Sequence, residues 1–110
     1  MRRARAGQTE PTLLVAEQQT AGRGRLGRVW QSDVGASLML SLGLPMAPRD
    51  WSGLSLAVGV SVAESLQPTL PPPGSALPRI GLKWPNDLWL GGAQGDRKLG
   101  GILVETASFV

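Results

Sequence analysis

The 110-residue chain contains no cysteine and no histidine. These absences exclude disulfide bonds, thiolate and imidazole metal sites, cysteine nucleophiles and catalytic triads that depend on histidine. Carboxylates, lysines, arginines and backbone groups must therefore carry any chemistry that the chain performs.

Long hydrophobic runs are also missing. The longest apolar stretch, around residues 54–66, is interrupted by serine, glycine and glutamate and is too short to cross a bilayer. The basic N-terminus is not followed by the apolar segment of a signal peptide. The apolar fraction of 42% is enough for one small core. We therefore expect a cytoplasmic protein that has no membrane partner.

Charge is modest in total, at +3, but uneven in placement, because six arginines lie within the first 28 residues. Arg2, Arg3 and Arg5 are expected to belong to a disordered basic N-terminus over residues 1–11, and residues 12–110 to form one partial domain. The remaining three arginines, at positions 23, 25 and 28, indicate an anionic partner.

Hydrophobic periodicity predicts an α+β fold with a mixed, largely antiparallel sheet and a packed helix. Strands are expected at Thr12–Ala16, 37–44, 80–84, 88–90 and, after a hairpin loop, 99–106. The alternation in the second of these strands predicts one buried face, formed by Leu38, Leu40, Leu42 and Leu44. Asp50 can cap a helix whose apolar face repeats at Trp51, Leu54, Val58, Val62 and Leu66.

A glycine-rich loop over residues 20–35 contains the pattern G-x-G-x-x-G at positions 22–27. Neither a dinucleotide-binding site nor a kinase glycine loop fits, because no helical pattern follows and the partner motifs are missing. The residues of this loop nonetheless suit an anionic ligand on physical grounds. Glycines let the backbone approach a ligand closely, arginines bind phosphate or carboxylate oxygens, and Trp30 offers a stacking surface. On composition alone, a merely solvated loop fits equally well.

Three strings of residues, in order, resemble the motifs of biotin protein ligases. They are EQQTAGRGRLGRVW at 17–30, KWPNDL at 83–88 and RKLGGILVE at 97–105. The resemblance implies the biotin/lipoate ligase catalytic fold, which is similar to that of class II synthetases. It also implies a site assembled from all three strings.

The resemblance assigns roles to individual residues of these strings. Biotin is expected at Gln19, Gly22, Arg23, Gly24, Lys98 and Gly101, and the nucleotide at Arg25, Arg28, Trp30, Asn86 and Asp87. Lys98 is the expected catalytic residue, placed between the biotin carboxylate and the α-phosphate, where a fixed cation offsets the charge of two approaching anions. Asp87 is the expected Mg²⁺ ligand. Lys83 is expected to be structural.

The family's reaction implies ATP, biotin and Mg²⁺ as ligands and a biotin carboxyl carrier protein as partner. Residues 1–11 hold no Ser-Thr-Asn-like biotin motif and no DNA-binding domain is visible. We therefore expect this chain to correspond to the middle of a ligase and to turn over little biotin by itself. Three alternatives remain open: a lipoate-type protein ligase, an arginine-glycine module that binds nucleic acid, and a non-functional remnant that keeps the motifs.

Overall fold

The computed structural model of the chain describes residues 1–108 and divides into two compact units. One unit contains residues 1–49 and the C-terminal segment from Glu105, and the other contains residues 50–104. The predicted α+β architecture is confirmed, and every strand pair within residues 1–108 is antiparallel. The predicted division into a disordered start and one domain over 12–110 stays a prediction.

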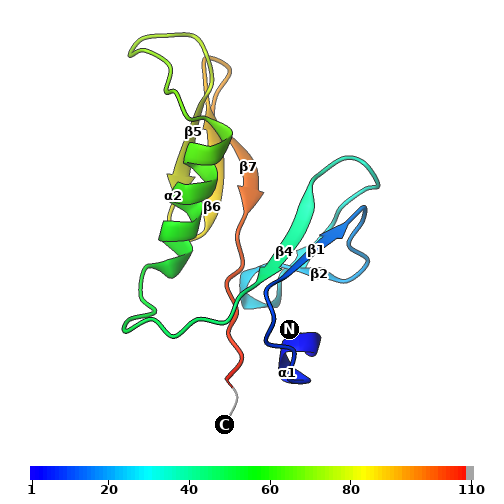
Figure 1. Cartoon of the computed structure of the whole chain (residues 1–110). Helices are drawn as coiled ribbons and strands as arrows, with labels where there is room; N and C mark the ends of the chain where they lie inside the picture. The colour runs from blue at the N-terminus through cyan, green and yellow to red at the C-terminus, as the bar shows by residue number, and fades with distance from the viewer. Residues whose placement is uncertain (109–110) are drawn as a thin grey trace. The chain divides into compact units, whose positions relative to one another are not determined.

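The first unit is built on a two-stranded sheet that pairs β1 (Thr12–Ala16) with β4 (Met39–Gly43). Its N-terminus carries the one-turn helix α1 (Arg2–Arg5), in which no residue is buried. Between the two long strands, β2 (Gly22–Arg23) and β3 (Val29–Trp30) form a short hairpin around the 3₁₀ turn η1 (Arg25–Gly27). Regular structure therefore occurs within the segment that the sequence predicts as a loop (Figure 1).

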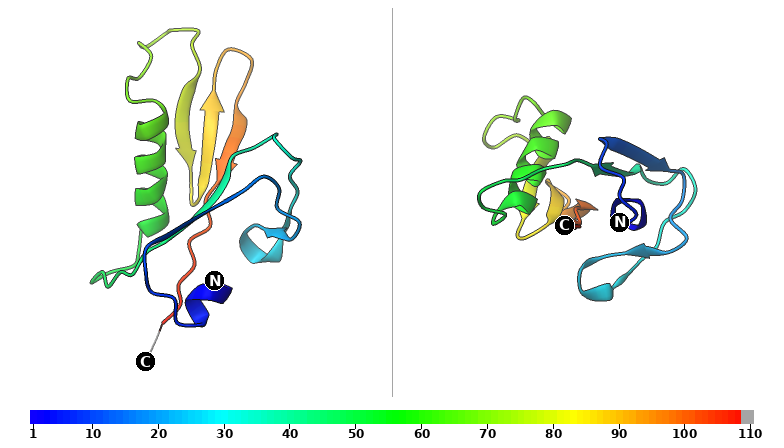
Figure 2. Two further views of the ribbon diagram at one scale, coloured as in Figure 1. Left: turned by 45° about the vertical axis from the view of Figure 1, so that its right-hand side comes forward. Right: turned by 60° about the horizontal axis from the view of Figure 1, so that its bottom comes forward.

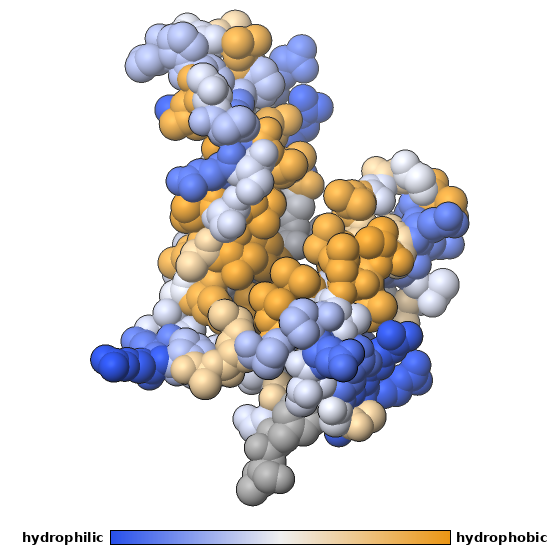
Figure 3. Space-filling model, in the orientation of Figure 1, coloured by the Kyte–Doolittle hydropathy of each residue, from blue (hydrophilic) through white to orange (hydrophobic). Residues whose placement is uncertain are grey.

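One face of the β1–β4 sheet is apolar but uncovered within residues 1–108. The register places Leu13 opposite Leu42 and Val15 opposite Leu40, so these four side chains share a face. Their exposed fractions are 61%, 59%, 63% and 55% respectively. The prediction that Leu38, Leu40, Leu42 and Leu44 are buried is therefore wrong for this chain. The buried residue of β4 is Met39, on the opposite face. Figure 3 shows apolar side chains at the surface over β1 and β4.

The second unit packs α2 (Leu54–Leu66) on a three-stranded sheet (Figures 1 and 2). The sheet order is β5 (Arg79–Lys83), β6 (Asp87–Gly91) and β7 (Arg97–Gly101). The fifth predicted strand, 99–106, is therefore displaced, because pairing with β6 begins at Arg97 and ends at Gly101. A register shift beside Leu88 leaves Leu99 as an extra residue in β7.

Helix α2 approaches the sheet most closely at Gly59, its one buried residue. A Cβ atom at Gly59 would lie 2.9 Å from Cδ2 of Leu82 and 3.6 Å from Cδ1 of Ile102. The missing side chain therefore allows helix and sheet to meet. The predicted apolar stripe is right in its middle and wrong at its ends, because Trp51 and Leu66 are exposed. No helix within residues 1–108 is long and apolar enough to span a membrane.

Asp50 forms a turn before α2 and does not cap the helix itself. Its carboxylate accepts hydrogen bonds from the backbone N–H of Ser52 and from the Ser52 hydroxyl, both at 2.8 Å. These bonds, the backbone one first, lower the pKa of the Asp50 carboxyl from its ordinary value of 3.8. The residue that precedes the helix is Gly53, whose φ of 73° is the left-handed conformation that glycine adopts without strain.

Candidate functional site

The first candidate group lies on the hairpin of residues 22–30, here called the arginine hairpin. Gly22 pairs with Trp30 and Arg23 with Val29, while the N–H of Gly24 donates to the carbonyl of Arg28 at 2.7 Å. The side chains of Arg23, Arg25 and Arg28 are all exposed. Three guanidinium groups on one short hairpin are suited to bind phosphate or carboxylate oxygens.

Gly22 is the position where this hairpin has no room for a side chain. It is buried, and a Cβ atom there would lie 2.8 Å from the Trp30 carbonyl oxygen and 3.1 Å from Oε1 of Gln19. A Cβ at Gly24 would meet nothing nearer than 3.8 Å. Gln19 and Trp30, two predicted ligand contacts, therefore both lie close to the backbone of Gly22.

Ser32 holds the segment before the hairpin in place. Its hydroxyl accepts a hydrogen bond from the N–H of Gln19 at 3.0 Å, and its carbonyl accepts one from the side chain of Gln18 at 3.1 Å. A hollow of about 490 Å³ is lined by residues 18–22 and 29–33. This hollow is wide open to solvent. Ser32 is not among the predicted site residues, because a serine two residues after the motif gives no signal of this role.

The tip of the arginine hairpin has an unusual backbone. Leu26 has a φ of 58°, which is rare for a residue with a side chain, although 89% of its surface is exposed. Such conformations store local strain and are common in ligand clamps. The tip is therefore a segment whose conformation a bound ligand could stabilise.

The second candidate group lies on the three-stranded sheet. Nζ of Lys98 on β7 and Oδ1 of Asp87 on β6 form an ion pair at 2.9 Å. The side chains are 40% and 23% exposed respectively, so both remain reachable from solvent. A Cβ at Gly101 would lie 3.7 Å from both groups of this pair, at Asp87 Oδ1 and Lys98 Nζ. Lys98, Asp87 and Gly101, three predicted site residues, are therefore neighbours.

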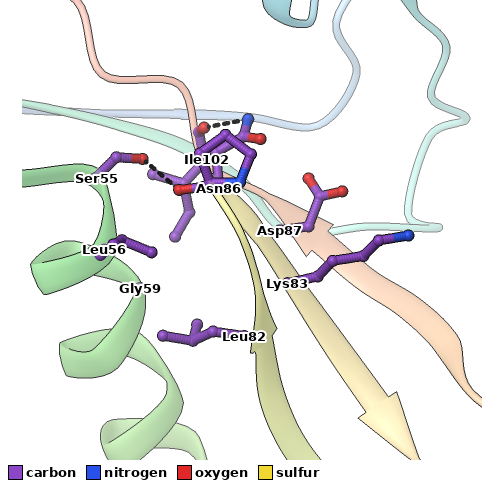
Figure 4. A pocket seen from close by; sticks show the side chains of 9 residues that line it. Ser55, Leu56, Gly59, Leu82, Lys83, Asn86, Asp87 and Ile102 are labelled. Carbon is purple, nitrogen blue, oxygen red and sulfur yellow. Dashed lines mark hydrogen bonds between the residues drawn. The ribbon is translucent and has the colours of Figure 1, made fainter. Parts of the chain in front are cut away.

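The side chain of Asn86 contacts Ile102, the residue that follows β7. Its side-chain N–H donates to the carbonyl of Ile102 at 2.8 Å, and its own carbonyl accepts from the N–H of Ile102 at 2.8 Å. Ser55 of α2 donates to the carbonyl of Pro85 at 3.2 Å, after the cis Trp84–Pro85 bond. Figure 4 shows these contacts around a depression that has no room even for water. Asn86 thus joins the β5–β6 turn to the end of β7, and its contact with a nucleotide stays a prediction.

The structure brings the predicted residues into two groups, one in each unit. Gln19, Gly22, Arg23, Gly24, Arg25, Arg28 and Trp30 belong to the first unit, and Asn86, Asp87, Lys98 and Gly101 to the second. Trp89 is not among the predicted residues either, although the centroid of its ring lies 4.4 Å from Nζ of Lys83. The alternation of Asp87 and Trp89 along one strand was the signal available for it.

The donor set for a metal ion is small. Residues 1–108 contain no cluster of three or more side chains able to hold a metal, and Asp87 already pairs with Lys98. Mg²⁺ is nonetheless often held by one carboxylate together with water and substrate phosphates. Asp87 fits that limited role.

Comparison with known proteins identifies relatives along almost the whole chain. The family model described as the biotin/lipoate A/B protein ligase family matches residues 3–108. The biotin–[acetyl-CoA-carboxylase] ligase of Mycobacterium tuberculosis is 40% identical over 109 residues, which cover 96% of this chain and 38% of that protein. The bifunctional ligase/repressor BirA of Escherichia coli is 46% identical over 93 residues, covering 83% and 26% respectively.

A human protein is also similar. The biotin–protein ligase of Homo sapiens is 31% identical over 98 residues, which cover 86% of this chain and 13% of that protein. No solved structure is significantly similar to the chain. The chain thus spans less than two fifths of the length of each of these three relatives.

Proposed function

The chain belongs to the biotin/lipoate A/B protein ligase family, and from that premise we propose that it serves the ATP-dependent adenylation of biotin and the transfer of biotin to a lysine of a carrier protein. The relatives described above are named as biotin ligases, which supports biotin as the substrate. A carrier domain of a biotin-dependent carboxylase is the proposed acceptor, and the cytoplasm the proposed location.

The observation that carries the proposal is the ion pair between Lys98 and Asp87. The 2.9 Å contact fixes an ammonium group on the sheet, and the 40% exposure of Lys98 leaves that group accessible to a ligand. When two anions react with each other, a cation that is already fixed in place lowers their repulsion with little reorganisation.

In the proposed first step, a carboxylate oxygen of biotin forms a bond to the α-phosphorus of ATP. The bond from that phosphorus to the bridging oxygen breaks, and pyrophosphate leaves with the electron pair. Lys98 would lie between the two anions and lower their repulsion, while Arg25 and Arg28 would bind phosphate oxygens. Mg²⁺, when bound, would neutralise phosphate charge beside Asp87.

In the proposed second step, the acceptor lysine amine attacks the carbonyl carbon of the mixed anhydride. An amide bond forms, AMP leaves, and the amine loses a proton to solvent. The chain needs no nucleophile of its own for either step, in agreement with a sequence that lacks cysteine and histidine. Its contribution would be to position the reactants and neutralise charge.

Two alternatives compete with this function. A lipoate-type ligase would share the fold and the adenylation chemistry, but the arginine-glycine string at 22–28 resembles that of biotin ligases. A nucleic-acid module would use the same exposed arginines and Trp30 for phosphate contact and stacking. The ion pair on the sheet has no role in that second alternative.

Pyrophosphate release by the chain, measured with ATP and either biotin or lipoate, tests the choice of substrate. Release that depends on biotin supports the proposal, and release that depends on lipoate alone contradicts it. Calorimetry against biotin, an ATP analogue and single-stranded DNA across a salt series tests the second alternative. Steeply salt-dependent DNA binding without any response to biotin would favour the nucleic-acid module.

A further inference from the structure

Lys83, Asp87, Trp89 and Lys98 lie together on the face of the three-stranded sheet that points away from α2, and these four residues are here called the lysine face. Arg79 lies on the same side at the other end of β5. Leu82 contacts α2 at Gly59, so its neighbour Lys83 points to the other side. The register pairs Lys83 with Asp87, and Trp89 with Lys98. Directly paired residues project from the same side of an antiparallel sheet. Figure 4 shows Lys83 and Asp87 pointing away from the helix and Leu82 pointing toward it.

The charges on this face do not balance. Asp87 is the only carboxylate of the four residues, and its partner is Lys98. Nζ of Lys83 lies over the Trp89 ring, 4.4 Å from its centroid, and forms no ion pair with any residue of 1–108. Two ammonium groups and one carboxylate leave one positive charge on the lysine face. An anion is the ligand that such a face favours.

Trp89 adds a third donor. Its indole N–H is buried and has no hydrogen-bond partner among the described residues. Unsatisfied buried donors are uncommon in folded proteins, and each calls for a structural or functional reason. An acceptor that approached the face with a shift of the Lys83 side chain would supply the missing partner.

The face also has open space beside Trp89. Gly81 pairs with Trp89 across β5 and β6, and a Cβ atom at Gly81 would meet nothing within 4 Å. The backbones of β5 and β7 lie about 10 Å apart, twice the spacing of neighbouring strands. A ligand with two linked phosphates can contact a lysine on each of these outer strands.

We propose that Lys83 and Trp89 form a subsite for the phosphate chain of the nucleotide, next to the position at which Lys98 would contact the α-phosphate. This inference rests on the proposed function, and it changes the role of Lys83 from structural to ligand-binding. Lys83 donates to a phosphate oxygen beyond the α-phosphate, and the indole N–H of Trp89 donates to the same group. The subsite therefore binds ATP and the leaving pyrophosphate but not biotin.

Calorimetry of the full 110-residue chain tests the subsite with ATP, inorganic pyrophosphate and biotin as probes. Lys83→Met keeps most of the side-chain length and removes the charge. We expect it to weaken ATP and pyrophosphate binding by about 10- to 100-fold, the scale of one hydrogen bond to a charged group, and to leave biotin binding unchanged. Lys83→Arg keeps the charge and a contact with the ring, so it should retain most of the affinity.

Arg79→Met is the matched control. Arg79 lies on the same strand and the same face as Lys83, but four residues away, which is about 13 Å along the strand. The Arg79→Met substitution removes the same charge as Lys83→Met but does not change any residue of the proposed subsite. If Arg79→Met weakens pyrophosphate binding as much as Lys83→Met does, general charge attraction explains the effect and the subsite is wrong.

Gly81→Val offers a second way to test the inference if Lys83→Met fails to fold. The added side chain fills the open space beside Trp89 and favours a strand conformation. We expect it to weaken pyrophosphate binding while the circular dichroism spectrum stays that of the parent chain. Unchanged pyrophosphate binding in Gly81→Val and in a folded Lys83→Met would overturn the subsite.

Biotin-dependent pyrophosphate release, measured in parallel, separates this inference from the proposed function. Release that is present but insensitive to Lys83→Met overturns the subsite alone. Absence of both release and biotin binding, together with pyrophosphate binding that depends on Lys83, overturns the proposed function and keeps the subsite as an anion site. If the parent chain binds neither biotin nor pyrophosphate, both are overturned.

Discussion

Nζ of Lys98 lies 2.9 Å from Oδ1 of Asp87, so the proposed catalytic cation and the proposed metal ligand are each other's partner. Either group can serve a ligand fully only if this pair lengthens or is shared with the ligand. A phosphate oxygen that approaches Lys98 competes with the Asp87 carboxylate. A divalent cation near Asp87 would relieve that competition by attracting both anions.

Asp87→Asn tests this coupling. The substitution keeps the shape of the side chain and removes its charge. We expect biotin-dependent pyrophosphate release to fall and its Mg²⁺ requirement to rise, whereas metal-free ATP should bind more tightly because a like charge has gone. The free energy of unfolding should change by about 1 kcal/mol or less, because the ion pair is partly exposed.

Asp96→Asn is the control for Asp87→Asn, since Asp96 lies in the hairpin loop at the other end of β6 and β7. It should leave pyrophosphate release and the Mg²⁺ titration as in the parent chain. If Asp87→Asn and the parent need the same Mg²⁺ concentration for pyrophosphate release, Asp87 is not a metal ligand.

Several parts of the fold were predictable because they depend on local pattern. The strand Thr12–Ala16 has the predicted bounds, and the β5–β6 hairpin falls where apolar runs flank Pro85. The resemblance to biotin protein ligases is confirmed by the family match and the relatives. Local strings of residues thus identify both the strands and the family.

Other parts depend on contacts that a one-dimensional pattern cannot specify. Alternation in residues 37–44 predicts one apolar face but cannot say whether anything covers it, and the leucines of that face are exposed. Leu99 is an extra residue in β7 because of a register shift, which moves the strand from its predicted place. Lys83 gave no signal beyond its motif, because its position over Trp89 follows from strand pairing.

Gly22→Ala should disrupt the arginine hairpin. The new Cβ would lie 2.8 Å from a backbone oxygen of Trp30, which cannot move without separating β2 from β3. A cost of about 1–3 kcal/mol is typical of such overpacking. We therefore expect biotin affinity, measured by calorimetry, to fall by about tenfold or more.

Gly43→Ala on β4 is the matched control for Gly22→Ala, because Gly43 is not a predicted site residue. Its Cβ would meet nothing nearer than 3.8 Å, and its φ is not positive, so alanine fits there. Its biotin affinity should stay close to that of the parent chain. Equal losses for the two variants would mean that glycine flexibility, and not the close contact at Trp30, governs binding.

The exposed arginines allow a proteolytic test of the arginine hairpin. Trypsin should cut after Arg23, Arg25 and Arg28 in the free chain, and biotinyl-adenylate should slow those cuts because the ligand orders the hairpin. Cleavage after Arg2, Arg3 and Arg5 serves as the internal control and should keep its rate. Equal rates at Arg23, Arg25 and Arg28 with and without bound ligand would rule out ordering of the hairpin.

Asp50 gives a prediction on pH. The hydrogen bonds from Ser52 lower the pKa of its carboxyl below 3.8, so the folded state favours the charged form. The stabilisation is complete above the unfolded pKa and is lost as pH falls through the lower, folded pKa. Asp50→Ala should therefore lower the melting temperature at pH 7, and the difference from the parent should shrink below pH 3.8. A difference independent of pH would exclude the charged turn as its cause.

Lys98→Ala should have the largest effect on the proposed chemistry. In a full-length ligase that contains this segment, we expect biotin adenylation, followed as pyrophosphate release, to fall by about 10²–10³, the scale for losing one preorganised charge-stabilising donor. Lys98→Arg should restore it only in part, because a planar guanidinium cannot place a compact point charge between two oxyanions. Transfer from pre-made biotinyl-adenylate, followed by single-turnover labelling of a carrier domain, should suffer less, since the two anions are already joined. Equal losses in both steps would indicate a general loss of binding. No loss in either step would leave Lys98 as a structural partner of Asp87 with no part in catalysis.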